Sequence, residues 1–455
     1  MENMMKQSIP IHIPTDSWDS KQPERTRLWV DEINSQSSTS RDETSESLSA
    51  PEEGEEQSEE ETEEENVQMR KNTCTEDITA VPAKKLLLAR AMADKLMQEK
   101  QVTGAIRELI RCVVLARITY GDGHWRLAQS HANLAYGYLQ LKELPLQAKQ
   151  HAESAKNIML TRTHKPDSAK EKKEILETLL TLFYTLGAAN LILNTAEDCY
   201  QNLQKAEKIM EDMQRMCKTK NEEACVSEKQ LTNALGRACL LQNNPVLARE
   251  YFNKTAALVA AKEGDCTEEL ISIYHDMAKA EQMRGKHDKS IEHLLQAHSV
   301  AVALYTKLSV EAAQTALQLA KGYAAPGRVQ YFQPAEMYFQ DSINAYQTAL
   351  GADSPQYFSA VDDFSIWLIQ TGNKEEAFDY LKKSLKTRLE VFGDFSENVA
   401  ETYYKLGSIS MADGDVKKAS KFLKKCVMIQ NVVYGAQHKK TRQTQQFVDK
   451  LQKND

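Results

Sequence analysis

The chain has 455 residues, and its 57 lysines and arginines against 65 aspartates and glutamates give a formal net charge of −8. The charge is uneven, because residues 1–70 hold 19 acidic and only 6 basic side chains. We see no run of about 18 apolar residues that would span a membrane and no basic and apolar start typical of a secretory signal. We therefore expect a protein of a reducing compartment, without disulfides or membrane insertion.

Motifs that carry chemistry are missing from the sequence. The eight cysteines form no C-x-x-C pair, which argues against a zinc site. A Gly-rich phosphate loop, G-x-S-x-G and H-E-x-x-H are also absent. The ten histidines are scattered, and we interpret His131 and His151 as helix residues rather than ligands. The expectation is no enzyme activity, no catalytic residues, no cofactor and no metal.

Residues 1–80 are polar and lack any apolar period. Ten of the fourteen residues from 52 to 65 are glutamates, so this tract repels itself and has little to bury. The sequence predicts a disordered, Glu/Ser-rich acidic arm over 1–80. It is either an interaction arm or a solubilising tail.

A repeat of 42 residues organises the rest of the chain. It separates Gly351, Gly393 and Gly435, and also Gly372 and Gly414. Each unit is predicted to form two helices. The second helix carries a small residue, a bulky apolar residue or Ala four positions after it, and another small residue three positions further on. The first helices each carry a small residue near the centre: Ala93, Ala135, Gly187, Gly236, Ala278, Ala320, Ser365 and Gly407. Small residues let two helices approach closely, and stacking the pairs buries a continuous core. Longer connections are expected at 161–174 and 217–228.

This pattern resembles the tetratricopeptide repeat over about residues 82–435. Leu134-Ala135-x-x-Tyr138 and Leu235-Gly236-x-x-Cys239 match the signature of its first helix. The 42-residue unit is longer than the common one of about 34 residues. Units of this length with Gly-x-x-His near the join, as at 121–124, look like those of kinesin light chain. The resemblance implies an all-α fold, a right-handed superhelical solenoid of about eight helix pairs over 81–436. Residues 437–455 are then a capping helix and tail.

Residues 108–152 resemble one branch of this family more specifically. That resemblance implies a non-enzymatic protein-binding scaffold of the primary cilium or the microtubule cytoskeleton, including spindle and midbody. For the closer relative it implies the ciliary zone that holds the Ellis–van Creveld complex in Hedgehog signalling. Members of that ciliary-base complex, or tubulin, are then the expected partners, and the location is cytoplasmic.

By analogy with the family, the residue next to the small site of each first helix and the residue about three before it line a peptide-binding groove. Arg237, Lys279 and Lys321 are spaced by 42 and 42, so they occupy one place in three successive units. We call them the cation row; it matches an extended acidic peptide, although each cation could equally well solvate its own helix. The predicted peptide-binding residues are Arg237, Lys279, Lys321, Asn233, His275, Tyr136, Tyr184 and Tyr404. The tract 52–65 is a possible intramolecular occupant.

Two other partners fit parts of the sequence. Asn233 and the cation row loosely resemble the carboxylate clamp of co-chaperones, which would make the chain an adaptor for acidic C-terminal peptides. Lysines 165, 170, 172 and 173 could instead meet acidic tubulin tails, but Asp167, Glu171 and Glu174 dilute that patch and favour a solvated helix start. The small net positive charge outside the arm argues against nucleic acid.

Overall fold

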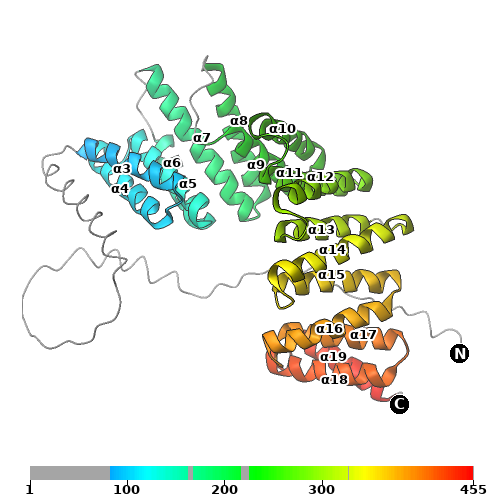
Figure 1. Ribbon diagram of the computed structural model, residues 1–455. Coiled ribbons are helices and arrows are strands. Elements are labelled where there is room, and N and C mark those ends of the chain that lie inside the picture. Colours follow the sequence, from blue (N-terminus) through cyan, green and yellow to red (C-terminus); the bar gives the residue numbers. More distant parts are fainter. Residues whose placement is uncertain (1–81, 162–167, 217–224, 326, 454–455) are drawn as a thin grey trace, which may run out of the picture. The chain divides into compact units, whose positions relative to one another are not determined.

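The computed structural model describes residues 82–161, 168–216, 225–325 and 327–453 (Figure 1). Throughout these ranges the chain is α-helical, with one short 3-10 helix and no strand. The chain divides into two units, residues 1–78 and 79–455, and all described residues belong to the second. The predicted disorder of 1–80 lies outside the described residues, so the second unit alone is discussed below.

Eight helix pairs follow one another in the second unit, as the 42-residue repeat predicts. Their first helices are α3 (Pro82–Gln98), α5 (Trp125–Lys142), α7 (Ala169–Ile192), α9 (Glu228–Leu241), α11 (Glu268–Met283), α13 (Val310–Ala324), α15 (Pro355–Thr371) and α17 (Glu397–Ala412). Their second helices are α4 (Val102–Tyr120), α6 (Pro145–Leu160), α8 (Ala196–Met216), α10 (Pro245–Glu263), α12 (His287–Tyr305), α14 (Phe332–Leu350), α16 (Lys374–Phe392) and α18 (Val416–Val433). The 3-10 helix η1 (Val329–Tyr331) precedes α14, and α19 (Lys439–Lys453) follows the last pair.

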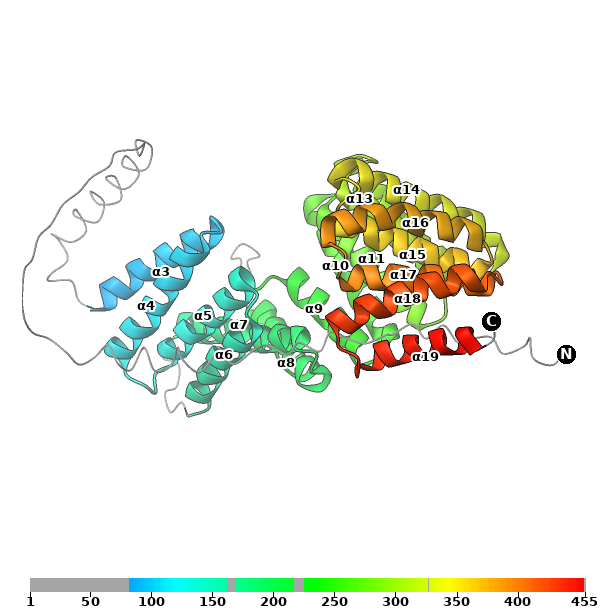
Figure 2. The ribbon, with the colours of Figure 1, turned by 90° about the horizontal axis from the view of Figure 1, so that it is seen from below.

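Each helix contacts the next one along the chain, so the core is shared between neighbouring pairs (Figures 1 and 2). First helices also touch across pairs, since α5 contacts α7, α7 contacts α9, and α9 contacts α11. At the end of the chain, Val448 and Leu451 of α19 pack with Leu423 and Val427 of α18. The all-α stack of eight helix pairs is therefore confirmed.

The small residues of the repeat lie at the places where two helices approach most closely. A Cβ on Gly236 would lie 2.5 Å from Phe252 Cε1, and one on Gly407 would lie 2.7 Å from Leu423 Cγ. The same holds at Gly187, where the nearest atom of Leu203 is at 2.5 Å. The bulky residue of the second helix therefore fills the space that the missing side chain leaves. Burial confirms the register in all eight second helices, whose members of the pattern are at most 4% exposed.

The recurring glycines are explained by backbone conformation. Gly351, Gly393 and Gly435 follow second helices with φ of 92°, 75° and 85°, which an L side chain rarely adopts. The corresponding position after α12 is Thr306, which has φ 80° and ψ 160° without being glycine. Thr306 is therefore a strained exception within the repeat.

The connection predicted over 161–174 is shorter than expected. Helix α7 already begins at Ala169, because the Ser168 hydroxyl accepts a hydrogen bond from the Glu171 backbone N–H at 3.1 Å. The Trp125 indole N–H also donates to the Glu171 carboxylate at 2.9 Å, which ties α5 to the first turn of α7. Of the second predicted connection, 217–228, residues 217–224 lie outside the described residues. The connection ends where Ser227 and Gln230 form the capping box of α9.

Candidate functional site

The cation row lies on three first helices. Arg237 is on α9, Lys279 on α11 and Lys321 on α13, and all three are exposed. One helical turn before them lie three residues that also share the 42-residue spacing: Asn233, His275 and Leu317. We call these six residues the α9–α13 face. The sequence predicted their equivalent positions, whereas their pairing within the protein was not foreseen.

Two of the three cations already have acidic partners on the next first helix. The Arg237 guanidinium Nε lies 2.6 Å from Asp276 Oδ2 of α11, and Lys321 Nζ lies 2.7 Å from Asp363 Oδ2 of α15. Both basic side chains remain 43% exposed, so each pair contributes only about 0.2–1 kcal/mol. A carboxylate of a bound peptide could compete with these partners.

Lys279 differs from its two counterparts. The position in α13 that corresponds to Asp276 is Gln318, which offers no charge. Among the described residues Lys279 has no ion pair. The cation row thus contains one unpaired lysine between two paired cations. Aligning Asp276, Gln318 and Asp363 across the three extra residues near 326–327 could have revealed this from the sequence.

Two polar side chains of the face have unsatisfied atoms. Asn233 Oδ1 and His275 Nε2 are shielded from solvent and have no hydrogen-bond partner in the described part of the chain. Burial lowers the pKa of His275, against the opposing effect of Asp276, so the ring is neutral near pH 7. A carboxamide oxygen and a neutral imidazole can both bond to a peptide backbone. Buried polar atoms without partners are costly, which makes these two atoms candidates for a ligand contact.

The three predicted tyrosines occupy unlike environments. Tyr136 and Tyr184 are only 7% and 6% exposed, and their ring centroids lie 6.3 Å apart. The Tyr136 hydroxyl donates to the Cys225 carbonyl oxygen at 3.4 Å, and burial raises the pKa of Tyr136 to about 12. These two rings therefore pack α5 and α7 against the chain before α9. Tyr404, which is 37% exposed, presents its ring to solvent on α17.

A second charged cluster lies further along the chain and was not predicted. Asp362 of α15 forms ion pairs with Arg388 of α16 at 3.0 Å and with Lys405 of α17 at 2.9 Å. Arg388 is 2% exposed, and it also donates to the Phe358 carbonyl oxygen at 3.1 Å. The Asp362 carboxylate therefore links α15, α16 and α17, and removing it would leave the buried Arg388 charge without its partner.

Metal and catalytic chemistry find little support in the described residues. They contain no group of three or more His, Cys, Asp or Glu side chains placed to hold a metal ion. His131 and His151 stack at 5.7 Å, and burial lowers the pKa of His131 to about 4. The six cysteines in these ranges are free thiols, four of them buried.

Among the described residues, α7 is the one helix that is long and apolar enough, by length and composition alone, to cross a membrane. More than half of its most apolar stretch is buried inside the protein, and it contacts α5, α6, α8 and α9. Those contacts are the ones expected of a core helix in a stack of pairs.

Comparison with known proteins adds a family to this geometry. Residues 359–398 and 400–432, which fall on the pairs α15–α16 and α17–α18, match the tetratricopeptide repeat. Tetratricopeptide repeat protein 23-like of Mus musculus is 43% identical over 382 residues, covering 83% of this chain and 82% of that protein. Tetratricopeptide repeat protein 23 of Homo sapiens is 38% identical over 370 residues, covering 81% and 82%. These are the two paralogues that residues 108–152 resemble, with the 23-like protein favoured.

Among solved structures, repeats of a candidate kinesin light chain from Podosopora anserina are 17% identical and cover 44% of this chain and 94% of that one, with a TM-score of 0.39. Tetratricopeptide repeat proteins are typically non-enzymatic scaffolds that bind other proteins. On the sequence identity and coverage of these relatives, the chain belongs to the tetratricopeptide repeat family, as a protein–protein interaction scaffold of the branch that contains proteins 23 and 23-like.

Proposed function

We propose that this scaffold binds an extended, acidic peptide segment of a partner protein on the α9–α13 face. The observation that carries the proposal is the unpaired Lys279, flanked in register by Arg237 and Lys321. Ion pairs already join α9 to α11 and α13 to α15, so cations in equivalent places on these first helices suit several carboxylates along one extended chain. Asn233 Oδ1 and His275 Nε2 would supply polar contacts to the peptide backbone.

The test uses fluorescence anisotropy with a labelled Glu-rich peptide and the full-length chain. Lys279→Glu is expected to weaken binding more than Arg237→Glu, because only Lys279 has no internal carboxylate to compete with the peptide. Asp276→Asn and Asp363→Asn are expected to strengthen binding, since they free Arg237 and Lys321. A merely solvated cation row would leave the affinity and its salt dependence unchanged in the triple reversal of Arg237, Lys279 and Lys321 to Glu.

Two other occupants of the same face are outcomes of this test. A peptide ending in a free carboxylate that binds far better than its amidated form would favour the co-chaperone-like adaptor. Competition by a synthetic peptide of residues 52–65 would favour an intramolecular contact of the acidic arm. Binding of an internal acidic segment, insensitive to the peptide's terminus, supports the scaffold as proposed.

The cellular setting that we propose is the base of the primary cilium or the microtubule cytoskeleton, including spindle and midbody. Its support is the resemblance of residues 108–152 to the branch named above. Proximity labelling with the tagged chain in ciliated, cycling cells tests it. Enrichment of ciliary-base membrane proteins supports the signalling setting, enrichment of tubulin and midbody proteins supports the cytoskeletal one, and enrichment of chaperones alone argues against both.

A further inference from the structure

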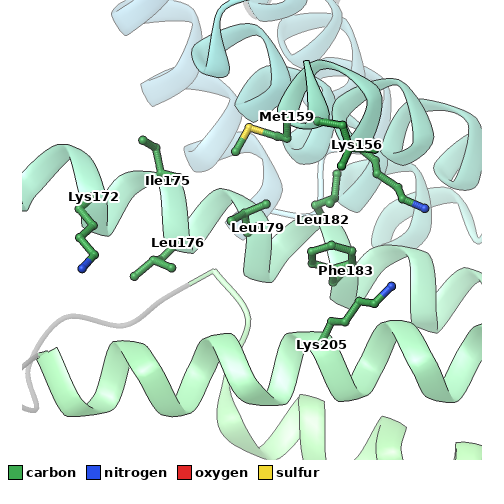
Figure 3. Close-up of a pocket in the computed structure, with 10 residues that line it drawn as sticks. Lys156, Met159, Lys172, Ile175, Leu176, Leu179, Leu182, Phe183 and Lys205 are labelled. Carbon is green, nitrogen blue, oxygen red and sulfur yellow. The ribbon is translucent and has the colours of Figure 1, made fainter. Parts of the chain in front are cut away.

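A second surface feature lies away from the α9–α13 face. An apolar hollow of about 540 Å³ opens along α7, between the second helices α6 and α8. Its floor consists of Ile175, Leu176, Leu179, Leu182 and Phe183 of α7, with Met159 and Leu160 from α6 (Figure 3). None of its lining residues comes from α5, α9, α11 or α13.

The charged residues of this hollow are all basic. Lys156 of α6, Lys172 of α7 and Lys205 of α8 line it, and no acidic side chain does. In the described ranges none of the three has an ion pair, although Lys205 Nζ lies 5.5 Å from the centroid of the Phe183 ring. Figure 3 shows Lys172 at one end of the apolar row and Lys156 and Lys205 near the other end, beside Phe183.

The dimensions of the hollow suit a helix. At 1.5 Å per residue, α7 covers about 17 Å from Lys172 to Phe183, which matches three turns of a partner's helix laid along it. The volume falls within the range of about 300–1,000 Å³ that ligand-binding clefts have. An amphipathic helix fills such a groove with side chains at i, i+3, i+4 and i+7.

We propose that the α6–α8 hollow binds an amphipathic helix of a partner protein, with leucine-like side chains on one face and carboxylates on both flanks. The apolar floor selects the first feature, and the three unpaired lysines select the second. The acidic tract of this chain fits poorly, because residues 52–65 contain glutamate, glycine, glutamine, serine and threonine but no apolar side chain. The hollow shares no lining residue with the α9–α13 face, so this proposal stands independently of the proposed function.

The experiment titrates the full-length chain against a labelled helical peptide of about 18 residues, with leucines on one face and glutamates beside them. A second peptide carries lysines in place of the glutamates, and a third has the first composition with the leucines spread around the helix. The test variant changes Lys156, Lys172 and Lys205 to Glu. The matched control changes Lys289, Lys386 and Lys424 to Glu; these are exposed on α12, α16 and α18, without ion pairs in the described residues.

The Leu/Glu peptide is expected to bind the natural chain and the control variant equally, and the test variant about tenfold more weakly. Leu176→Ser, a change of one half-buried floor residue, is expected to weaken binding without changing the helical circular dichroism spectrum. Equal binding of the third peptide, or full competition by a peptide of residues 52–65, would show attraction by charge alone and overturn the proposal. Binding to vesicles of phosphatidylcholine and phosphatidylserine with no binding of the Leu/Glu peptide would assign the hollow to a membrane surface instead.

Discussion

The contact between Gly236 and Phe252 gives the most direct test of how the helix pairs are built. Gly236 lies in the interior of α9, where replacing glycine by alanine normally stabilises a helix by about 0.5–1 kcal/mol. Here the added Cβ would meet three atoms of the Phe252 ring at 2.5, 2.8 and 2.9 Å. Those distances are too short for a carbon contact, so the ring or one of the helices must shift.

The expected sign of the effect is therefore reversed. Overpacking a close-packed core costs about 1–3 kcal/mol, which exceeds the gain in helix propensity. Gly236→Ala should lower the free energy of unfolding, and Gly236→Leu should lower it further, as should Gly407→Leu against Leu423. Gly104→Ala is a matched control, because its Cβ would approach only the flexible end of Leu96, at 3.3 Å.

Thermal and urea unfolding of the full-length chain measure the effect, and hydrogen exchange locates it in α9 and α10. Because repeat proteins can unfold in parts, the local exchange rates are the decisive measurement. Phe252→Leu should partly rescue Gly236→Ala, since it removes the ring that the new methyl group meets. An increase in stability for Gly236→Ala, equal to that of an exposed helical glycine, would refute the register of the repeat.

Three further predictions concern other parts of the stack. Thr306→Gly should raise the free energy of unfolding by about 1 kcal/mol, because it relieves the strain of a positive φ at a position where the repeat otherwise has glycine. Urea unfolding measures this gain, and Thr306→Ala should give none. Burial lowers the folded-state pKa of His131 to about 4, below its usual value of about 6.5. Between these two pH values only the unfolded chain takes up the proton, so the free energy of unfolding should fall as the pH drops through this window. His131→Gln should show a shallower pH dependence in the same unfolding assay. Burial raises the pKa of Cys199, Cys239 and Cys426 to about 12, so iodoacetamide should modify the exposed Cys266 in the folded chain and these three only after unfolding, as mass spectrometry of the digested protein can show.

Most of the fold was predictable because helix pairing depends on local residue size. The position of Gly236 and its partner Phe252 sixteen residues later follows from the 42-residue period alone, and the structure places them in contact. The glycines at 351, 393 and 435 were equally visible, and their positive φ values explain why they recur. Helix ends were harder: Ser168 caps α7 within the stretch 161–174, which the longer repeat spacing assigned to a connection.

The candidate site was predictable only in part, because a linear pattern does not show what a side chain meets. The period places Arg237, Lys279 and Lys321 correctly in register, yet it treats them as equal. The difference arises on the next first helix of the stack. Asp276 and Asp363 there pair with Arg237 and Lys321, whereas Gln318 stands where Lys279 would need an acid. Burial was likewise hidden for Tyr136, next to Ala135, and for Tyr184, three residues before Gly187, since the pattern places both positions on a groove.

Helix α7 connects the two proposed sites. Phe183 lines the hollow between α6 and α8, while its neighbour Tyr184 packs on Tyr136. Tyr136 in turn donates to the Cys225 carbonyl, two residues before the Ser227 cap of α9. A helix bound in the hollow would therefore contact the same element that supports the start of the α9–α13 face, and we expect a ligand that shifts α7 to act on both sites. By linkage, such a coupling is reciprocal, so occupation of either site would change the affinity of the other by the same factor. Equal affinities with and without the second peptide would show instead that neighbouring pairs isolate the two sites, as expected of a repeat whose units contact only their neighbours.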